Sequence, residues 1–123
     1  MIRFVQCVRR KQGLTVEDFR RHWKGYQDAL MELATASNAY RVSVGFGLKI
    51  PHNSAIQEMR GTQEPFDAVL EVWWESGAEV TRLENQPPIA AKLEAIRALQ
   101  VEFIDLQGSS FFFASEEFDQ ILD

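Results

Sequence analysis

The spacing of apolar residues changes period near residue 40, and this change constrains the fold more than any other feature. Between residues 16 and 34, apolar side chains recur every three or four positions, which is the spacing of an amphipathic helix. Between residues 40 and 50 they alternate with small or polar residues, which is the spacing of a strand with one buried face. A long helix followed directly by such a strand predicts a domain in which helices pack on a sheet.

The remaining patterned runs extend this pair to the order β-α-β-β-α-β. Thr15 is well placed to cap the first long helix. The further elements that we expect are strands at 2–8, 66–74 and 109–115, a long helix at 88–105, and short helices near 53–60 and at 77–84. This order predicts an α+β, ferredoxin-like fold, with a four-stranded antiparallel sheet and two main helices on one of its faces.

The sheet face away from the helices is predicted to be unusually apolar. Strand alternation places on it Val5, Cys7, Val69, Trp73 and one or two of the phenylalanines at 111–113. An antiparallel sheet with one solvated face normally carries polar residues there, and a large exposed apolar patch is typical of an interaction site. We therefore predict a homodimer in which a second subunit covers this face. Asp67 and Glu71 lie on the same face. An ion pair across the dimer, with Arg3 or Arg41 as the partner, is our interpretation of these carboxylates, and acid–base catalysis is the alternative.

Length and composition narrow the classes of function. The 123 residues suit a single domain, 1–123, and 46% hydrophobic with 25% charged residues is typical of a globular protein in water. A net charge of −5 argues against nucleic-acid binding, which needs a basic surface. The lone Cys7 excludes an intrachain disulfide.

No targeting or membrane signal is evident in the sequence. No run approaches the roughly 20 apolar residues of a membrane span, and the first residues lack the apolar segment of a signal peptide. We therefore expect a cytoplasmic protein without a membrane partner.

Three stretches together resemble the EthD family of the dimeric α/β-barrel superfamily. They are IRFVQCVRRKQGLTVEDFRRHW (2–23), PFDAVLEVWWES (65–76) and VEFIDLQGSSFFFASEE (101–117). The resemblance implies a ferredoxin-like fold and a dimer whose two sheets pack face to face as a barrel. Members of that superfamily include monooxygenases, cyclases, dehydratases and haem-degrading enzymes, and EthD proteins are associated with degradative pathways. The resemblance does not choose among these activities.

His22 is the leading candidate for catalysis. It flanks the apolar face of the first helix, and in the superfamily the small-molecule cavity lies between helices and sheet. A histidine ordinarily titrates near neutral pH, which suits acid–base work on a phenol or an enolisable carbonyl. The alternative is a boundary histidine bonded to a backbone carbonyl or a carboxylate. Many EthD-like sequences carry a second histidine five residues later, where this chain has Gln27.

Other side chains near His22 are candidates for binding. Tyr26, one helical turn on, can donate a hydrogen bond to a substrate oxygen as a second catalytic group, although a tyrosine there is also typical of a core. The candidate substrate-binding residues are Gln27, Trp23, Gln6 and Trp74. Aromatic walls suit a flat ligand, but packing in the core is the alternative for each tryptophan.

The sequence predicts neither a metal site nor a cofactor. His22 and His52 lie 30 positions apart without a paired ligand spacing. Our leading interpretation is an EthD-like enzyme that performs cofactor-independent acid–base or oxidative chemistry on an aromatic or quinone-like metabolite. The alternatives are a non-catalytic protein that binds a hydrophobic small molecule or assists a degradative pathway, and a purely structural dimer with a filled core.

Overall fold

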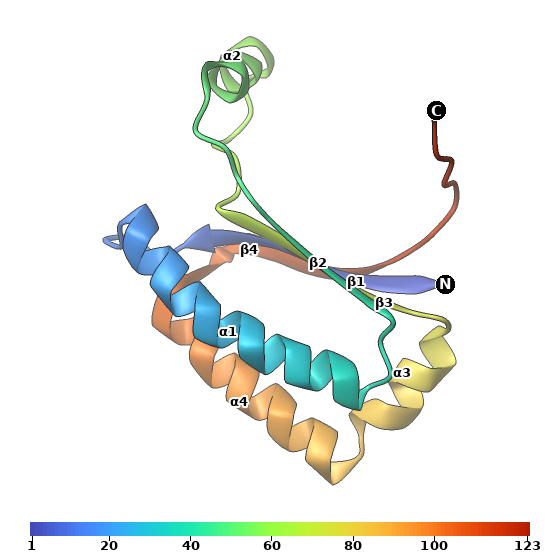
Figure 1. Ribbon diagram of the computed structural model, residues 1–123. Coiled ribbons are helices and arrows are strands. Elements are labelled where there is room, and N and C mark those ends of the chain that lie inside the picture. Colours follow the sequence, from blue (N-terminus) through green and yellow to red (C-terminus); the bar gives the residue numbers. More distant parts are fainter.

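A single antiparallel sheet organises the chain, and the computed structural model describes residues 1–123. The elements follow the order β1 (Ile2–Arg10), α1 (Val16–Ala36), β2 (Arg41–Phe46), α2 (Pro51–Arg60), β3 (Ala68–Trp74), α3 (Gly77–Glu84), α4 (Pro87–Phe103) and β4 (Ile104–Ser115). The strand order is β2-β3-β1-β4 with every neighbouring pair antiparallel, and α1 and α4 cover one face (Figure 1). The predicted ferredoxin-like topology is confirmed.

The core lies between this helix pair and the sheet. Thr15 caps α1 as expected, because its hydroxyl oxygen accepts a hydrogen bond from the Asp18 backbone N–H at 3.0 Å. The buried residues of α1 follow the predicted stripe and pack on strand residues that face the helices. They are Phe19, Trp23, Tyr26, Leu30 and Ala34.

Strand β2 is shorter than its alternating pattern predicts. The expected strand at 40–50 ends at Phe46, and the chain then leaves the sheet. A side chain at Gly47 would collide with the carbonyl oxygen of Phe66, so the two segments approach more closely there than any other residue type permits. The backbone N–H of Gly47 donates to the carbonyl of Asp67 at 3.1 Å. Apolar and polar residues continue to alternate in the sequence to residue 50, but the pairing of β2 with β3 ends at Phe46.

The last helix and the last strand meet without a loop. Helix α4 ends at Phe103 rather than near 105, and β4 starts at Ile104 rather than at 109. The pairing of β4 with β1 shifts register between Cys7 and Arg9. Ser109 holds this irregularity, because its hydroxyl accepts from the Arg9 backbone N–H at 2.9 Å and donates to the Asp105 carbonyl at 2.6 Å. The strand predicted at 109–115 begins at this irregularity, and the part of β4 that was not predicted, 104–108, precedes it.

The open face of the sheet carries the apolar residues expected from the sequence. Val5, Cys7, Val69 and Phe112 face away from the helices, and Val69 and Phe112 are exposed. Trp73 shares this face, whereas Trp74 lies in the helix-side core, so the predicted opposite orientation of the two rings is confirmed.

Charged side chains partly cover that face. The guanidinium groups of Arg3 and Arg41 lie 6.0 and 4.4 Å from the Trp73 ring centroid. Arg3 pairs with Glu71 at 3.8 Å, which is one of the expected partners but within the chain rather than across a dimer, and Asp67 pairs with Arg10 at 2.7 Å instead of with Arg3 or Arg41. Both ion pairs lie within one chain.

Two segments project from the body on the side opposite α1 and α4. One carries α2, none of whose residues is buried, and the other is the extended segment 116–123 (Figure 1). The predicted short helix in the 51–64 connection is therefore present, as Pro51–Arg60. None of the helices is both long enough and apolar enough to cross a membrane.

Candidate functional site

A hydrogen-bond network centred on Tyr26 lies in the middle of the core. The Tyr26 hydroxyl donates to Oε1 of Gln6 at 2.7 Å and accepts from Nε2 of Gln100 at 2.9 Å. Tyr26 is 0% exposed and Gln6 is 2% exposed. The three residues come from α1, β1 and α4, so the network joins both helices to the central part of the sheet.

The burial of Tyr26 fixes its protonation state. Burial raises the pKa of this phenol to about 12, while the hydrogen bonds from Gln100 and to Gln6 act in the opposite direction. The hydroxyl group therefore stays protonated at ordinary pH. It can donate a hydrogen bond to a substrate oxygen, but it cannot serve as a base in its neutral form.

Aromatic rings enclose this polar centre. The Tyr26 ring lies 5.2 Å from the Trp23 ring and 5.4 Å from the Phe103 ring, both in edge-on geometry. The Trp23 indole N–H donates to Oε1 of Gln27 at 3.1 Å, so this amide already has a partner within α1. The arrangement is a neutral hydrogen-bonding group inside an aromatic wall, with the hydrogen bonds of its hydroxyl made within the chain.

His22 lies on the outer side of the same wall. Its side chain is exposed, and its ring stacks on Phe103 with 5.4 Å between centroids and 7° between planes. It borders a shallow depression of about 250 Å³ with Asp18 and Arg21, which form an ion pair with each other. The single ring of Phe103 thus contacts both His22 and Tyr26.

The structure groups some of the predicted site residues and separates others. Tyr26, Trp23 and Gln6 form one cluster, with Gln27 at its edge. Trp74 lies further along β3, because it pairs with Ile2 whereas Leu70 pairs with Gln6. The Trp74 indole N–H donates to the carbonyl and hydroxyl oxygens of Ser37, each at 3.1 Å.

Sequence reasoning did not identify two residues of this cluster as site residues. Neither Phe103 nor Gln100 is singled out within the helix expected at 88–105. Gln100 is a polar residue beside the apolar stripe of α4, and such positions usually face solvent. The signal that could have found it is the presence of two other buried polar groups, Tyr26 and Gln6, which need partners.

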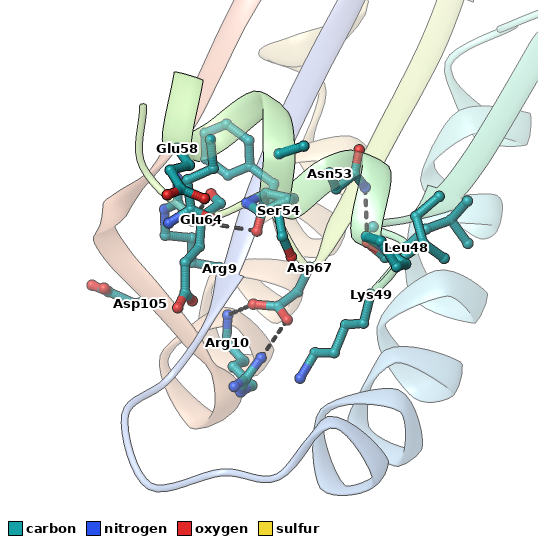
Figure 2. Close-up of a pocket in the computed structure, with 17 residues that line it drawn as sticks. Arg9, Arg10, Leu48, Lys49, Asn53, Ser54, Glu58, Glu64, Asp67 and Asp105 are labelled. Carbon is teal, nitrogen blue, oxygen red and sulfur yellow. Dashed lines mark hydrogen bonds and ion pairs between the residues drawn. The ribbon is translucent and has the colours of Figure 1, made fainter. Parts of the chain in front are cut away.

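A separate cleft of about 840 Å³ lies between α2 and the neighbouring end of the sheet (Figure 2). Asp67 accepts hydrogen bonds there from the backbone N–H of Arg10 at 2.8 Å and from its guanidinium at 2.7 Å. The Arg9 guanidinium lies 4.2 Å from the Phe66 ring centroid and donates to the Glu64 carbonyl at 2.6 Å. These arginines therefore fasten β1 to the segment before β3. The walls of this cleft are mostly polar, unlike those around Tyr26.

No metal centre can be assigned among the described residues. No group of three or more His, Cys, Asp or Glu side chains is arranged so that it could hold a metal ion.

No protein-family model and no curated protein sequence matches this chain. Solved structures do match along almost the whole chain. An ethyl tert-butyl ether d (EthD) family protein from Bacillus halodurans is 9% identical, with a TM-score of 0.64 over 95% of this chain and 99% of that one.

Two further solved structures are similar to this chain along almost its whole length. A dimeric protein of unknown function with a ferredoxin-like fold, from Bacteroides fragilis, is 12% identical, with a TM-score of 0.60 over 94% of this chain and 95% of that one. SnoaB, a cofactor-independent oxygenase from Streptomyces nogalater, is 13% identical, with a TM-score of 0.54 over 96% of this chain and 94% of that one.

At these identities the comparisons establish the fold and leave the chemistry open. The EthD-like architecture expected from the sequence is confirmed at the level of fold. This chain has the ferredoxin-like fold shared by an EthD family protein, a dimeric protein of unknown function and a cofactor-independent oxygenase.

Proposed function

We propose that this protein is an enzyme that binds a small aromatic or quinone-like molecule between its two long helices and the sheet. The observation that carries the proposal is the Tyr26 hydroxyl, fully buried and held by Gln6 and Gln100 inside an aromatic wall. A polar group in a core costs free energy unless it is fully hydrogen-bonded, so an apolar residue would be the simpler choice there for packing alone.

The roles of the residues follow from their placement. Phe103 separates Tyr26 from His22, and an aromatic substrate that displaces this ring would meet both side chains. Tyr26 would then donate its hydroxyl hydrogen bond to a substrate oxygen in place of Gln6. His22 would accept the proton of a phenol, or of a carbon next to a carbonyl, and the resulting anion would be stabilised by the Tyr26 hydroxyl. This proton transfer needs no cofactor.

The open sheet face supports a homodimer as the working form of this enzyme. Val69 and Phe112 are exposed on that face, and one similar structure is a dimeric protein. Apolar side chains in such a patch are stabilised when a second subunit removes them from water.

A non-catalytic binding protein is the second candidate, and two observations favour it. Gln27 stands where many EthD-like sequences carry a second histidine, and its amide is bonded to Trp23. The exposed His22 ring stacks on Phe103, and neither carboxylate nor carbonyl is among its hydrogen-bonding partners in the structure. Such a protein would bind the aromatic ring without transferring a proton.

The experiment is a tryptophan-fluorescence titration with hydroxyquinones and anthrone-like phenols, with absorbance scans for product. The variants are Tyr26→Phe and His22→Ala. Tyr40→Phe is the matched control, because it changes the only other tyrosine of the chain, which lies exposed outside the cluster.

Each outcome separates the candidates. The enzyme predicts turnover that is lost in His22→Ala, binding that weakens in Tyr26→Phe, and no change in Tyr40→Phe. Binding that survives in His22→Ala without turnover by any form would support the binding protein. Binding unchanged by Tyr26→Phe would contradict the site itself.

A further inference from the structure

Helix α2 stands away from the body of its own chain. None of its ten residues is buried, and it projects on the open side of the sheet (Figure 1). An isolated helix of this length is marginal in water, and most helical stability in proteins comes from packing of one face. The sequence of this helix is therefore expected to pack against a surface that a single chain does not provide.

The two sides of α2 differ in chemistry. Asn53 and Gln57 are half-buried and line the polar cleft with Glu58. The other side carries Ile56 and Met59, which are exposed, Met59 to 83%. At about 100° per residue, His52 and Arg60 fall on the same side as Ile56 and Met59, and Glu58 does not. We call His52, Ile56, Met59 and Arg60 the α2 stripe, which is apolar at its centre and has basic side chains beside it.

The segment 116–123 has the complementary composition. Its sequence EEFDQILD has four acidic residues and no basic one. Its three large apolar side chains, Phe118, Ile121 and Leu122, are all exposed, Ile121 to 86%. The segment forms neither helix nor strand, and it leaves the body on the same side of the sheet as α2 (Figure 1).

Within one chain, α2 and this segment lie at opposite ends of the sheet. The connection to α2 leaves at Phe46 and returns at Ala68, which pairs with Val8. The segment 116–123 follows Ser115, which pairs with Ile2 at the other end of β1. The six residue steps from Ile2 to Val8 correspond to about 20 Å of strand. Neither projecting segment therefore provides the packing surface for the other in its own chain.

A two-fold axis that brings two open faces together must run parallel to the sheets. If the axis runs along the strands, α2 meets the α2 of the other copy and segment 116–123 meets the other segment 116–123. Two segments with four acidic residues each then come together. Helix α2 leaves the sheet from β2 and β3, whereas segment 116–123 leaves it from β4, at the opposite edge. If the axis crosses the strands obliquely, at right angles to the line from α2 to segment 116–123, each segment 116–123 meets the α2 stripe of the other copy, where Arg60 and His52 flank apolar side chains. The second arrangement joins unlike charges and buries both sets of apolar residues.

We propose that segment 116–123 of one copy packs along the α2 stripe of a second copy of this chain, so that two such contacts clasp the dimer. The occupant of the stripe is thus this protein itself. The inference rests on the homodimer proposed above, to which it adds the orientation of the two subunits.

Cross-linking between differently labelled chains tests this contact. In a Cys7→Ser background, which removes the only cysteine, one chain carries Met59→Cys and the other Ile121→Cys. The chains are mixed, allowed to exchange subunits and treated with a short bismaleimide. The matched control replaces Met59→Cys by Val101→Cys, since Val101 is also an exposed helical residue but lies on α4, in the layer away from the open face.

We expect the mixed chains to form the covalent heterodimer about ten-fold faster than the Val101→Cys control, because docking raises the effective concentration of the two thiols. Equal rates for the two mixtures would overturn the proposal, as would faster cross-linking of Met59→Cys chains to one another. Sedimentation equilibrium of the Cys7→Ser background shows whether the dimer exists at all. If the protein is a dimer but the cross-linking rates are equal, only the contact between segment 116–123 and the α2 stripe is refuted, and the homodimer stands. Ligand binding at Tyr26 is measured separately by fluorescence.

Discussion

The hydroxyl group of Tyr26 lies in the core with no exposed surface, and two glutamine side chains complete its hydrogen bonds. A phenylalanine would fill nearly the same volume without needing them. The network therefore depends on all three partners at once, because a buried polar group without its partner loses the compensation for being removed from water. This dependence makes Tyr26 the most informative single position for mutation.

We expect Tyr26→Phe to lower the free energy of unfolding by about 1–3 kcal/mol, since it leaves the buried Gln6 carbonyl and the Gln100 amide without their partner. Urea unfolding followed by circular dichroism measures the change. Tyr40→Phe serves as the control and should leave the unfolding midpoint where it is, because Tyr40 is exposed. Equal midpoints for Tyr26→Phe and the native protein would contradict the network.

The same residue predicts how stability responds to alkaline pH. The folded state raises the pKa of Tyr26 to about 12 from an ordinary value near 10, so it keeps a proton that the unfolded state releases. This contribution is fully present below pH 10 and is lost as the pH rises towards 12, with a slope of up to about 1.4 kcal/mol per pH unit.

Unfolding free energies measured between pH 9 and pH 12 for the native protein and for Tyr26→Phe test this expectation. The difference between the two should shrink as the pH rises, because only the native protein loses the contribution of Tyr26. A difference that stays constant over that range would show that the phenol is not held in its protonated form.

The sequence predicts the residues that α1 contributes to this site, and it misses those that α4 contributes. Periodicity in α1 places Phe19, Trp23 and Tyr26 on the buried stripe correctly, because a helix face is set by spacing within one segment. Gln100 and Phe103 complete the site from another element, and their contacts with Tyr26 depend on how α4 packs on α1. Spacing within one segment carries no information about that packing.

At the scale of elements, polar contacts hold the end of the sheet next to α2. The Asp67 carboxylate accepts from the backbone and the side chain of Arg10, and Arg9 reaches the carbonyl of Glu64. These contacts fix the strand ends at the point where the chain departs towards α2.

We expect Asp67→Ala to lower the free energy of unfolding by about 1–3 kcal/mol, because it leaves the Arg10 backbone N–H and guanidinium without their acceptor. Thermal and urea unfolding measure the loss. Arg21→Ala removes the exposed pair with Asp18 and should cost no more than about 1 kcal/mol, because exposed ion pairs contribute little. Losses of the same size in both variants would contradict this role of Asp67.

The boundaries of elements were less predictable than their order. Alternation continues to residue 50, but β2 ends at Phe46 because the backbones of Gly47 and Phe66 approach closely. The direct junction between Phe103 and Ile104 has no glycine or proline to mark it, and the register shift beside Ser109 depends on a contact with β1. Such boundaries are set by pairing between distant segments.

At the scale of the whole molecule, the sheet has two apolar faces, of which only one packs on helices of its own chain. The helix-side face packs on α1 and α4 and contains the Tyr26 network. The open face carries Val69 and Phe112 exposed and has α2 and segment 116–123 beside it. On our account, the first face binds the small molecule and the second binds another copy of the chain.

Native mass spectrometry with a bound hydroxyquinone tests this division most directly, because it reports subunit number and ligand number together. The native protein is compared with Phe112→Asp, which places a charge on the open face, and with the control Val101→Asp on the exposed side of α4. Circular dichroism confirms that each variant is folded.

We predict a native dimer with up to two ligands, a Phe112→Asp monomer with one ligand, and a Val101→Asp dimer like the native protein. A native monomer would contradict the role assigned to the open face. A folded Phe112→Asp monomer that binds no ligand would contradict the separation of the two faces, because the ligand site would then require both subunits.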